Sequence, residues 1–121
     1  MLFLLVVSLS ACAGAERERR GGVTPSYSEI GEASFYGAGF QGKRTASGER
    51  FDVKRLTAAH RTLPFGTKLL VTNLRNGKRV WVRVNDRGPY TGGRIVDVSF
   101  EAARRLGFIP QGVTLVRIEA Y

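Results

Sequence analysis

The chain has 121 residues, 43% apolar and 10% aromatic, so it is long enough for one folded domain with its own core and is not expected to be disordered. Its single cysteine excludes an internal disulfide, and one cysteine with one histidine cannot fill a four-ligand zinc site. The net charge of +9 lies wholly in residues 31–121, where 16 Lys and Arg stand against 7 Asp and Glu, and such a field gathers nucleic acid, anionic lipid or an acidic polymer.

The first predicted element is an export signal. Residues 1–10 form a short apolar run without charged side chains. This run is too short to cross a bilayer but long enough for the core of a signal peptide. It leads into Leu9-Ser10-Ala11-Cys12, which resembles the lipobox of bacterial lipoproteins, whose cysteine is lipidated. The alternative for Cys12 is an ordinary buried side chain. We expect residues 1–11 to be a lipoprotein signal peptide, and a translation start upstream of Met1 would supply the basic residue that usually opens such a signal.

Residues 12–30 predict a lipidated cysteine and a flexible tether, because this stretch is polar and charge-balanced and contains Pro25 and two adjacent glycines. Ala13 stands where an aspartate would indicate retention at the inner membrane. By resemblance to sorted lipoproteins, we expect a periplasmic domain anchored in the outer membrane. The folded domain is expected over residues 31–121.

Six short strands are predicted in this domain, at residues 32–36, 56–60, 67–74, 78–85, 95–98 and 113–120. The third and fourth flank Asn76-Gly77, a dipeptide suited to the positive φ angles of a tight hairpin. In the fourth, Val80, Val82 and Val84 alternate with Arg and Trp, which predicts one buried face.

One short helix is predicted after the fifth strand. Ser99 is placed to cap its N-terminus, Gly107 to end it, and Phe100, Ala103 and Leu106 to face inward. Six strands with one short helix predict an all-β barrel.

Several strings then stand together in a fixed order. They are Gly31-Glu32-Ala33-Ser34-Phe35-Tyr36-Gly37, Thr45-Ala46-Ser47-Gly48-Glu49, Leu56-Thr57-Ala58-Ala59-His60, Leu63-Pro64-Phe65-Gly66-Thr67, Val84-Asn85-Asp86-Arg87-Gly88-Pro89-Tyr90 and Arg94-Ile95-Val96-Asp97-Val98-Ser99. In composition, order and spacing they resemble the rare lipoprotein A (RlpA) family, the septal-ring lytic transglycosylases of bacterial peptidoglycan. The resemblance covers essentially all of residues 31–121.

The resemblance implies a six-stranded double-psi β-barrel, as in expansins and family-45 endoglucanases. It implies endolytic cleavage between N-acetylmuramic acid and N-acetylglucosamine, on strands stripped of stem peptides, with 1,6-anhydro ends formed without water. It implies no metal and no cofactor. Many members carry a C-terminal SPOR module that binds such strands. We expect no such module here, so septal targeting is left open. We expect a monomer with division proteins as further partners.

The chemistry needs a proton donor for the leaving oxygen and stabilisation of an oxocarbenium-like transition state. Hydrolases usually employ two carboxyl groups. In a lytic transglycosylase the sugar's own 6-hydroxyl replaces water, so one carboxyl group can protonate the leaving oxygen and later accept that hydroxyl's proton. The acidic residues of the domain are therefore the catalytic candidates.

Asp86 and Asp97 are the first two candidates. Asp86 ends the valine-rich strand, where a rigid element can aim a carboxylate into a cleft, and the alternative is an aspartate that stabilises the following turn. Asp97 lies 11 residues later, and we expect two adjacent strands to bring both carboxylates to one side. By resemblance to barrel transglycosylases and expansins, Asp97 is the expected acid/base. Its alternative is support of the helix start at Ser99.

Three further polar residues match family positions. Glu49 lies in a polar loop and is taken as a third catalytic carboxylate rather than a solvated one. Asp52 is a supporting candidate. His60 is expected to orient a carboxylate or hydrogen-bond a sugar, and the alternative is a satisfied core histidine.

Aromatic side chains are the candidates for stacking on sugar rings. Tyr90 and Tyr36 flank the expected cleft, and Trp81 is a weaker candidate because its neighbouring arginines can cover it. Lys and Arg can pair with muramyl carboxylates, although most of them are expected to form a solvated basic face.

Two other functions remain open from the sequence. The same barrel can serve as a non-catalytic, expansin-like peptidoglycan-binding or division-associated lipoprotein. A basic nucleic-acid module is disfavoured, since an exported chain rarely meets nucleic acid and no aromatic-basic signature is present. We expect no nucleic-acid partner.

Overall fold

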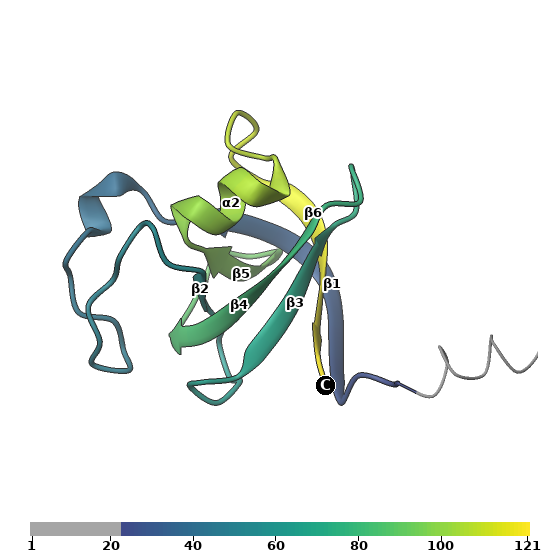
Figure 1. The fold of residues 1–121 in the computed structure, drawn as a ribbon, viewed down its shortest axis with the longest axis horizontal. Coiled ribbons are helices and arrows are strands. Elements are labelled where there is room, and N and C mark those ends of the chain that lie inside the picture. Colours follow the sequence, from purple (N-terminus) through teal and green to yellow (C-terminus); the bar gives the residue numbers. More distant parts are fainter. Residues whose placement is uncertain (1–22) are drawn as a thin grey trace, which may run out of the picture.

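The structure is a computed structural model that describes residues 23–121, so the predicted signal peptide and Cys12 lie outside the described residues. Six strands close into one barrel in the order β1-β5-β2-β4-β3-β6 (Figure 1). The strands are β1 Tyr27–Phe35, β2 Thr57–Ala59, β3 Lys68–Asn73, β4 Arg79–Asp86, β5 Arg94–Val98 and β6 Thr114–Ala120. The predicted six-stranded barrel is confirmed. The long β1–β2 connection, with the short 3-10 helix η1 (Ala38–Phe40), projects from one side of it (Figure 1).

β1 begins earlier than the sequence predicted. Tyr27 pairs with Ala120 of β6, and the antiparallel pairing continues as far as Ala33 and Thr114. The boundary of the predicted tether at residue 30 is therefore wrong, since residues 27–30 belong to the barrel wall. Their exposed and half-buried side chains alternate, which gives a polar composition although the backbone is fully paired.

The β3–β4 hairpin is confirmed, but its turn differs from the predicted one. Gly77 has a φ of 78°, whereas no non-glycine residue among those described has a positive φ. Asn76 therefore does not take the left-handed conformation. The loop is longer than a two-residue turn, because the Asn73 carbonyl accepts hydrogen bonds from the amides of Asn76 and Gly77 and the Asn73 amide donates to Lys78.

The predicted alternation in β4 is confirmed, with Val80, Val82 and Val84 buried in the core and the residues between them more exposed. Helix α2 (Phe100–Leu106) lies across β1 and β4 and adds Leu106 to that core. The chain folds this way locally because apolar side chains repeat every second residue along β4.

The ends of α2 follow the prediction. Ser99 Oγ accepts a hydrogen bond from the Ala102 amide at 3.2 Å, and Gly107 ends the helix with a φ of 77°. The prediction that Phe100 faces inward is wrong, because this residue is 40% exposed. Its ring packs edge-on against that of Phe35, with the ring centroids 6.0 Å apart. Within residues 23–121, no helix is long and apolar enough to cross a membrane.

Two parallel strand pairs set the geometry of the site. In β1–β5 the register skips Ile95, and in β2–β4 it skips Asn85, so β5 and β4 each carry one extra residue. Such bulges bend a strand and redirect the side chains that follow. Gly31 allows the first one, since a Cβ at this position would lie 2.6 Å from Ile95 Cγ2.

Candidate active site

The strand register brings Asp86 and Asp97 to the same level of the barrel wall. Ala59 of β2 pairs with Asp97 of β5 on one side and with Asp86 of β4 on the other. The prediction that the two aspartates lie on adjacent strands is therefore wrong, because β2 separates them. At the usual strand spacing their backbones lie about 10 Å apart, and the residue between them carries a single methyl group. Two carboxylates placed in this way can approach one sugar from different sides.

Both aspartates line one groove of about 390 Å³. Tyr90 also lines the groove, and its side chain is 77% exposed. The groove is open to solvent, and its remaining lining residues come from β1, the β1–β2 connection, the segment after β4 and the start of β5: Ser34, Phe35, Tyr36, Phe40, Arg87, Gly88, Pro89 and Arg94. The structure thus gathers the two aspartates and two tyrosines that the sequence singled out.

Asp86 is fixed by three hydrogen bonds. Its Oδ2 accepts from the Tyr36 hydroxyl at 2.6 Å, and its Oδ1 accepts from the amides of Ala46 and Arg87 at 2.8 and 2.9 Å. Two donors, Tyr36 and Ala46, lie in the β1–β2 connection, and the third is the residue that follows Asp86 at the end of β4. The carboxylate therefore has little freedom to turn.

Tyr36 serves this arrangement as a donor. Burial, the hydrogen bond to Asp86 and the negative charges of Asp86 and Asp97 all raise the pKa of its phenol, so the hydroxyl stays protonated. Its ring stacks on Phe51 with centroids 4.6 Å apart and meets Phe40 edge-on. One ring face is therefore covered by protein, and we no longer expect Tyr36 to stack on sugar.

Asp97 has a freer environment. Ser34, its register partner on β1, donates a hydrogen bond to Oδ1. Within residues 23–121 no donor reaches Oδ2, so this oxygen can approach a ligand in the groove.

Glu49 lies beside the groove but does not line it. Its carboxylate accepts two hydrogen bonds from the Arg83 guanidinium, at 2.9 and 3.1 Å, and one from the Asn85 amide group. These contacts with Arg83 and Asn85 lower the pKa of Glu49, so it is ionised at neutral pH. Glu49 and Asp52 line a neighbouring hollow, where Asp52 accepts from the Lys54 amide and lies 3.8 Å from Arg55.

His60 is buried, with 3% of its surface exposed, and lies outside the groove. Its Nδ1 accepts from the amides of Thr62 and Leu63, so the proton resides on Nε2, which lies 3.2 Å from the Tyr27 hydroxyl. Its own amide donates to the Asp86 carbonyl. The side chain thus has the contacts of a satisfied core histidine, and its link to Asp86 runs through the backbone.

We predict that His60 makes stability depend on pH in a definite direction. Burial lowers the pKa of His60 in the folded chain, while the unfolded chain takes up this proton near the ordinary value of 6.5. The unfolded state therefore binds more protons as the pH falls through 6.5, and folding stability should decrease. Urea unfolding at about pH 7.5 and about pH 5.5 measures the loss. It should be smaller in His60→Gln, and an equal loss in both proteins would contradict the assignment.

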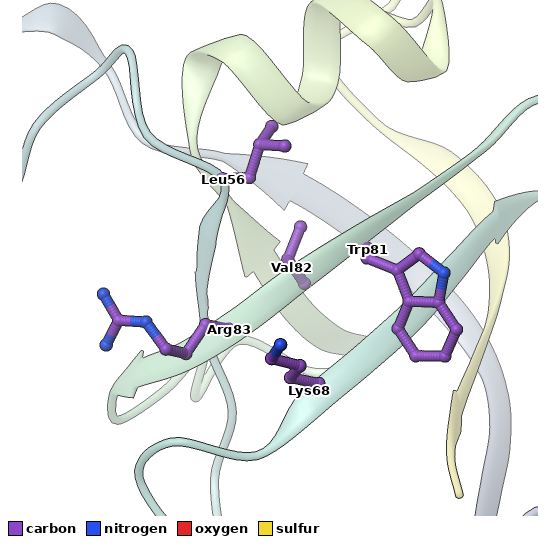
Figure 2. A pocket seen from close by; sticks show the side chains of 5 residues that line it. All are labelled: Leu56, Lys68, Trp81, Val82 and Arg83. Carbon is purple, nitrogen blue, oxygen red and sulfur yellow. The ribbon is translucent and has the colours of Figure 1, made fainter.

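Trp81 also lies apart from the groove. Its side chain projects from the outer face of β4 (Figure 2). It is 49% exposed, and its ring centroid lies 6.1 Å from that of Tyr121. It lines a hollow with Leu56, Lys68, Val82 and Arg83 (Figure 2). The structure therefore does not place Trp81 with the two aspartates.

Ser34 and Arg94 are polar groove residues that were not among the site candidates from the sequence. Ser34 contacts Asp97 only because β1 runs parallel to β5, and no local pattern signals that pairing. Arg94 lines the groove at the start of β5. Both residues belong to the strings that resemble the rare lipoprotein A family, and this membership was the signal that could have identified them as site residues.

The comparisons agree with this architecture. A model of the lytic transglycolase family matches residues 28–118. The solved structure of a Streptomyces papain inhibitor superposes with a TM-score of 0.64 and 20% identity, and the match covers 81% of this chain and 97% of the inhibitor chain. The apo structure of the Clavibacter michiganensis expansin has a TM-score of 0.62 and 26% identity, and the match covers 78% of this chain and 50% of the expansin chain. The barrel is the double-psi fold that the resemblance implied.

Named relatives are similar over the same region. A probable endolytic peptidoglycan transglycosylase RlpA of Synechocystis is 62% identical over 89 residues, which is 74% of this chain and 28% of the relative. The endolytic peptidoglycan transglycosylase RlpA of Neisseria meningitidis serogroup A is 54% identical over 93 residues, covering 77% and 39%. The Pseudomonas aeruginosa (strain UCBPP-PA14) protein of that name is 50% identical over 94 residues, covering 78% and 28%. The chain thus spans well under half of these relatives, and it belongs to the lytic transglycolase family, in its rare lipoprotein A group.

Proposed function

We propose that this chain is an endolytic peptidoglycan lytic transglycosylase that cuts the bond between N-acetylmuramic acid and N-acetylglucosamine. The observation that carries the proposal is the groove that Asp86, Asp97 and Tyr90 line together. Relatives of that name, at 50–62% identity over most of this chain, support the reaction. The preferred substrate is a glycan strand without stem peptides.

In the proposed step, Asp97 gives a proton from its carboxyl group to the glycosidic oxygen as the bond to C1 of the muramyl ring breaks. The 6-hydroxyl oxygen of the same ring then bonds to C1, and its proton passes to the Asp97 carboxylate. No water is consumed, and the carboxyl group is regenerated. The tethered nucleophile needs no separate binding site, which favours the intramolecular attack.

Asp86 is assigned to electrostatic stabilisation. Positive charge develops at C1 in the transition state, and a carboxylate held by three fixed donors needs no reorganisation to face it. Glu49 is assigned a positioning role, because its ion pair with Arg83 and its contact with Asn85 fix the residue that precedes Asp86. His60 supports Asp86 through its backbone amide, and Asp52 is assigned a supporting role in the neighbouring hollow that it shares with Glu49.

Substrate binding is assigned to Tyr90 and Arg94. The exposed Tyr90 ring offers an apolar face to a pyranose, and Arg94 brings a positive charge to the groove for the lactyl carboxylate of muramic acid. The basic domain as a whole attracts this anionic polymer. We place the protein in the cell envelope as a monomer, with division proteins as further partners.

The experiment is a product assay with purified protein and peptide-free glycan strands, analysed by mass spectrometry. We expect new 1,6-anhydro-muramyl ends. Strands that are bound but left intact would instead support a non-catalytic wall-binding protein, a second candidate favoured by the likeness to expansin. Reducing ends without the anhydro bridge would indicate hydrolysis and contradict the proposed step.

We also propose that Cys12 is lipidated and anchors the chain in the outer membrane. The support is the lipobox string at residues 9–12. Palmitate labelling of cells that express the chain should give a labelled band in the outer-membrane fraction, and Cys12→Ser should abolish it. A labelled Cys12→Ser protein would contradict the anchor.

A further inference from the structure

A second surface of the barrel combines an exposed aromatic ring with uncompensated positive charge. It is the outer face of β3 and β4 around Trp81, which we call the Trp81 face and define by Lys68, Leu70, Arg79, Trp81 and Arg83. Two hollows of about 520 and about 550 Å³ lie on either side of Trp81 and share it as a lining residue. Figure 2 shows Trp81 and Arg83 leaving β4, and Lys68 leaving β3, around the first hollow.

The apolar part of this face centres on the half-exposed ring of Trp81. Trp81 stands opposite Leu70, which is 8% exposed, and beside the Tyr121 ring. Covering a half-exposed aromatic ring with another apolar surface removes it from water, which is energetically favourable. Pyranose rings present such C–H-rich faces.

The charged part of the face favours an anionic ligand. Lys68 is paired directly with Arg83 across the two strands, and like charges in this position destabilise a sheet. Glu49 neutralises Arg83, but within residues 23–121 neither Lys68 nor Arg79 has an ion-pair partner. The acidic neighbour on β6 is Glu119, which pairs with Leu70, and Arg117 lies next to it across from Thr72. The local balance is positive.

The Trp81 face is also placed to meet a polymer that occupies the groove. Trp81 precedes Asp86 by five residues on β4, which corresponds to about 17 Å along the strand. Between them lies the Arg83–Glu49 ion pair, whose Arg83 lines the first hollow and whose Glu49 contacts Asn85. A ligand that reaches from one to the other must therefore be several sugar rings long.

We propose that the Trp81 face is an accessory binding surface for an anionic glycan strand, in which a pyranose ring stacks on Trp81 and muramyl carboxylates pair with Lys68 and Arg79. The inference rests on the proposed function for the choice of polymer. It extends substrate contact along β4, away from the two aspartates. It also explains why an exposed tryptophan stands among basic side chains outside the groove.

Trp81 is the single tryptophan of the chain, so its fluorescence reports on this face directly. Peptide-free glycan strands are titrated into the full chain carrying Asp97→Asn, which keeps the strands intact during the measurement if cleavage occurs as proposed. We expect a blue-shifted emission and protection of the ring from acrylamide. Calorimetry should show roughly tenfold weaker strand binding in Trp81→Ala and a reduced salt dependence in Lys68→Ala. Neutral chito-oligosaccharides of equal length should bind more weakly.

The matched control is Leu115→Ala, which removes another exposed apolar side chain, on β6, and should leave strand affinity unchanged. Two results together would overturn the inference, even if the product assay shows cleavage. They are a Trp81 emission that does not change when glycan is added, and a Trp81→Ala protein that binds the strands as tightly as the protein with Trp81. An emission shift that depends on protein concentration without glycan would also overturn it and indicate a contact between two copies. A glycan-induced shift in a protein that makes no anhydro ends would support the surface and contradict the proposed function.

Discussion

Asp97→Asn should reduce the formation of 1,6-anhydro-muramyl ends by roughly 10²- to 10⁴-fold, the usual contribution of a general acid. The asparagine amide cannot give up a proton to the leaving oxygen, although it keeps the shape of the side chain. Its carbonyl oxygen can still accept the hydrogen bond from Ser34, so the fold should be retained. Initial rates from the mass-spectrometric assay, with a thermal melt of each protein, measure both effects.

Glu101→Gln is the matched control for this substitution. Glu101 lies on α2 and pairs with Arg104 and Arg105, outside the groove lining. The same loss of one carboxylate should leave the cleavage rate within about twofold. If Asp97→Asn keeps more than a tenth of the normal rate, another group supplies the proton.

Asp86→Asn should also lower the cleavage rate, by roughly 10²-fold, through loss of charge rather than loss of a proton donor. Its Oδ1 equivalent can still accept from the amides of Ala46 and Arg87. The new NH2 group then faces the Tyr36 hydroxyl, which can rotate and accept from it. The groove should keep its shape while the negative charge beside C1 disappears.

The Tyr36→Phe substitution distinguishes the effect of the Asp86 negative charge from the effect of how the Asp86 carboxylate is positioned. It keeps the Asp86 carboxylate but removes one of its three donors, so we expect a smaller loss of about tenfold in kcat. A greater loss in Tyr36→Phe than in Asp86→Asn would contradict the electrostatic assignment. Rates, KM and melting temperatures of the two variants decide between these outcomes.

Local patterns in the sequence predicted much of the fold. The alternating valines of β4 indicated its buried face, and the pair of Ser99 and Gly107 indicated where α2 begins and ends. These features depend on residues within a few positions of one another. The early start of β1 was missed, because its pairing with β6 joins residues more than 80 positions apart.

The site candidates were identified by residue type and by the family strings, without their arrangement. Sequence order suggested that the strands of Asp86 and Asp97 are neighbours, whereas β2 lies between them and Ala59 sets their spacing. Glu49 was grouped with the aspartates by its family string and Trp81 was a candidate by its residue type, and the structure places both outside the groove lining.

Alternation, capping residues and charge are properties of neighbouring positions, so they were sufficient to predict a basic six-stranded barrel and its set of acidic candidates. Which carboxylates share a groove depends on contacts between distant parts of the chain. Closure of the barrel pairs β1 with β5 and β2 with β4, and one bulge in each pair redirects the strand that carries an aspartate. These long-range pairings set the direction of each side chain, and the local sequence does not encode them.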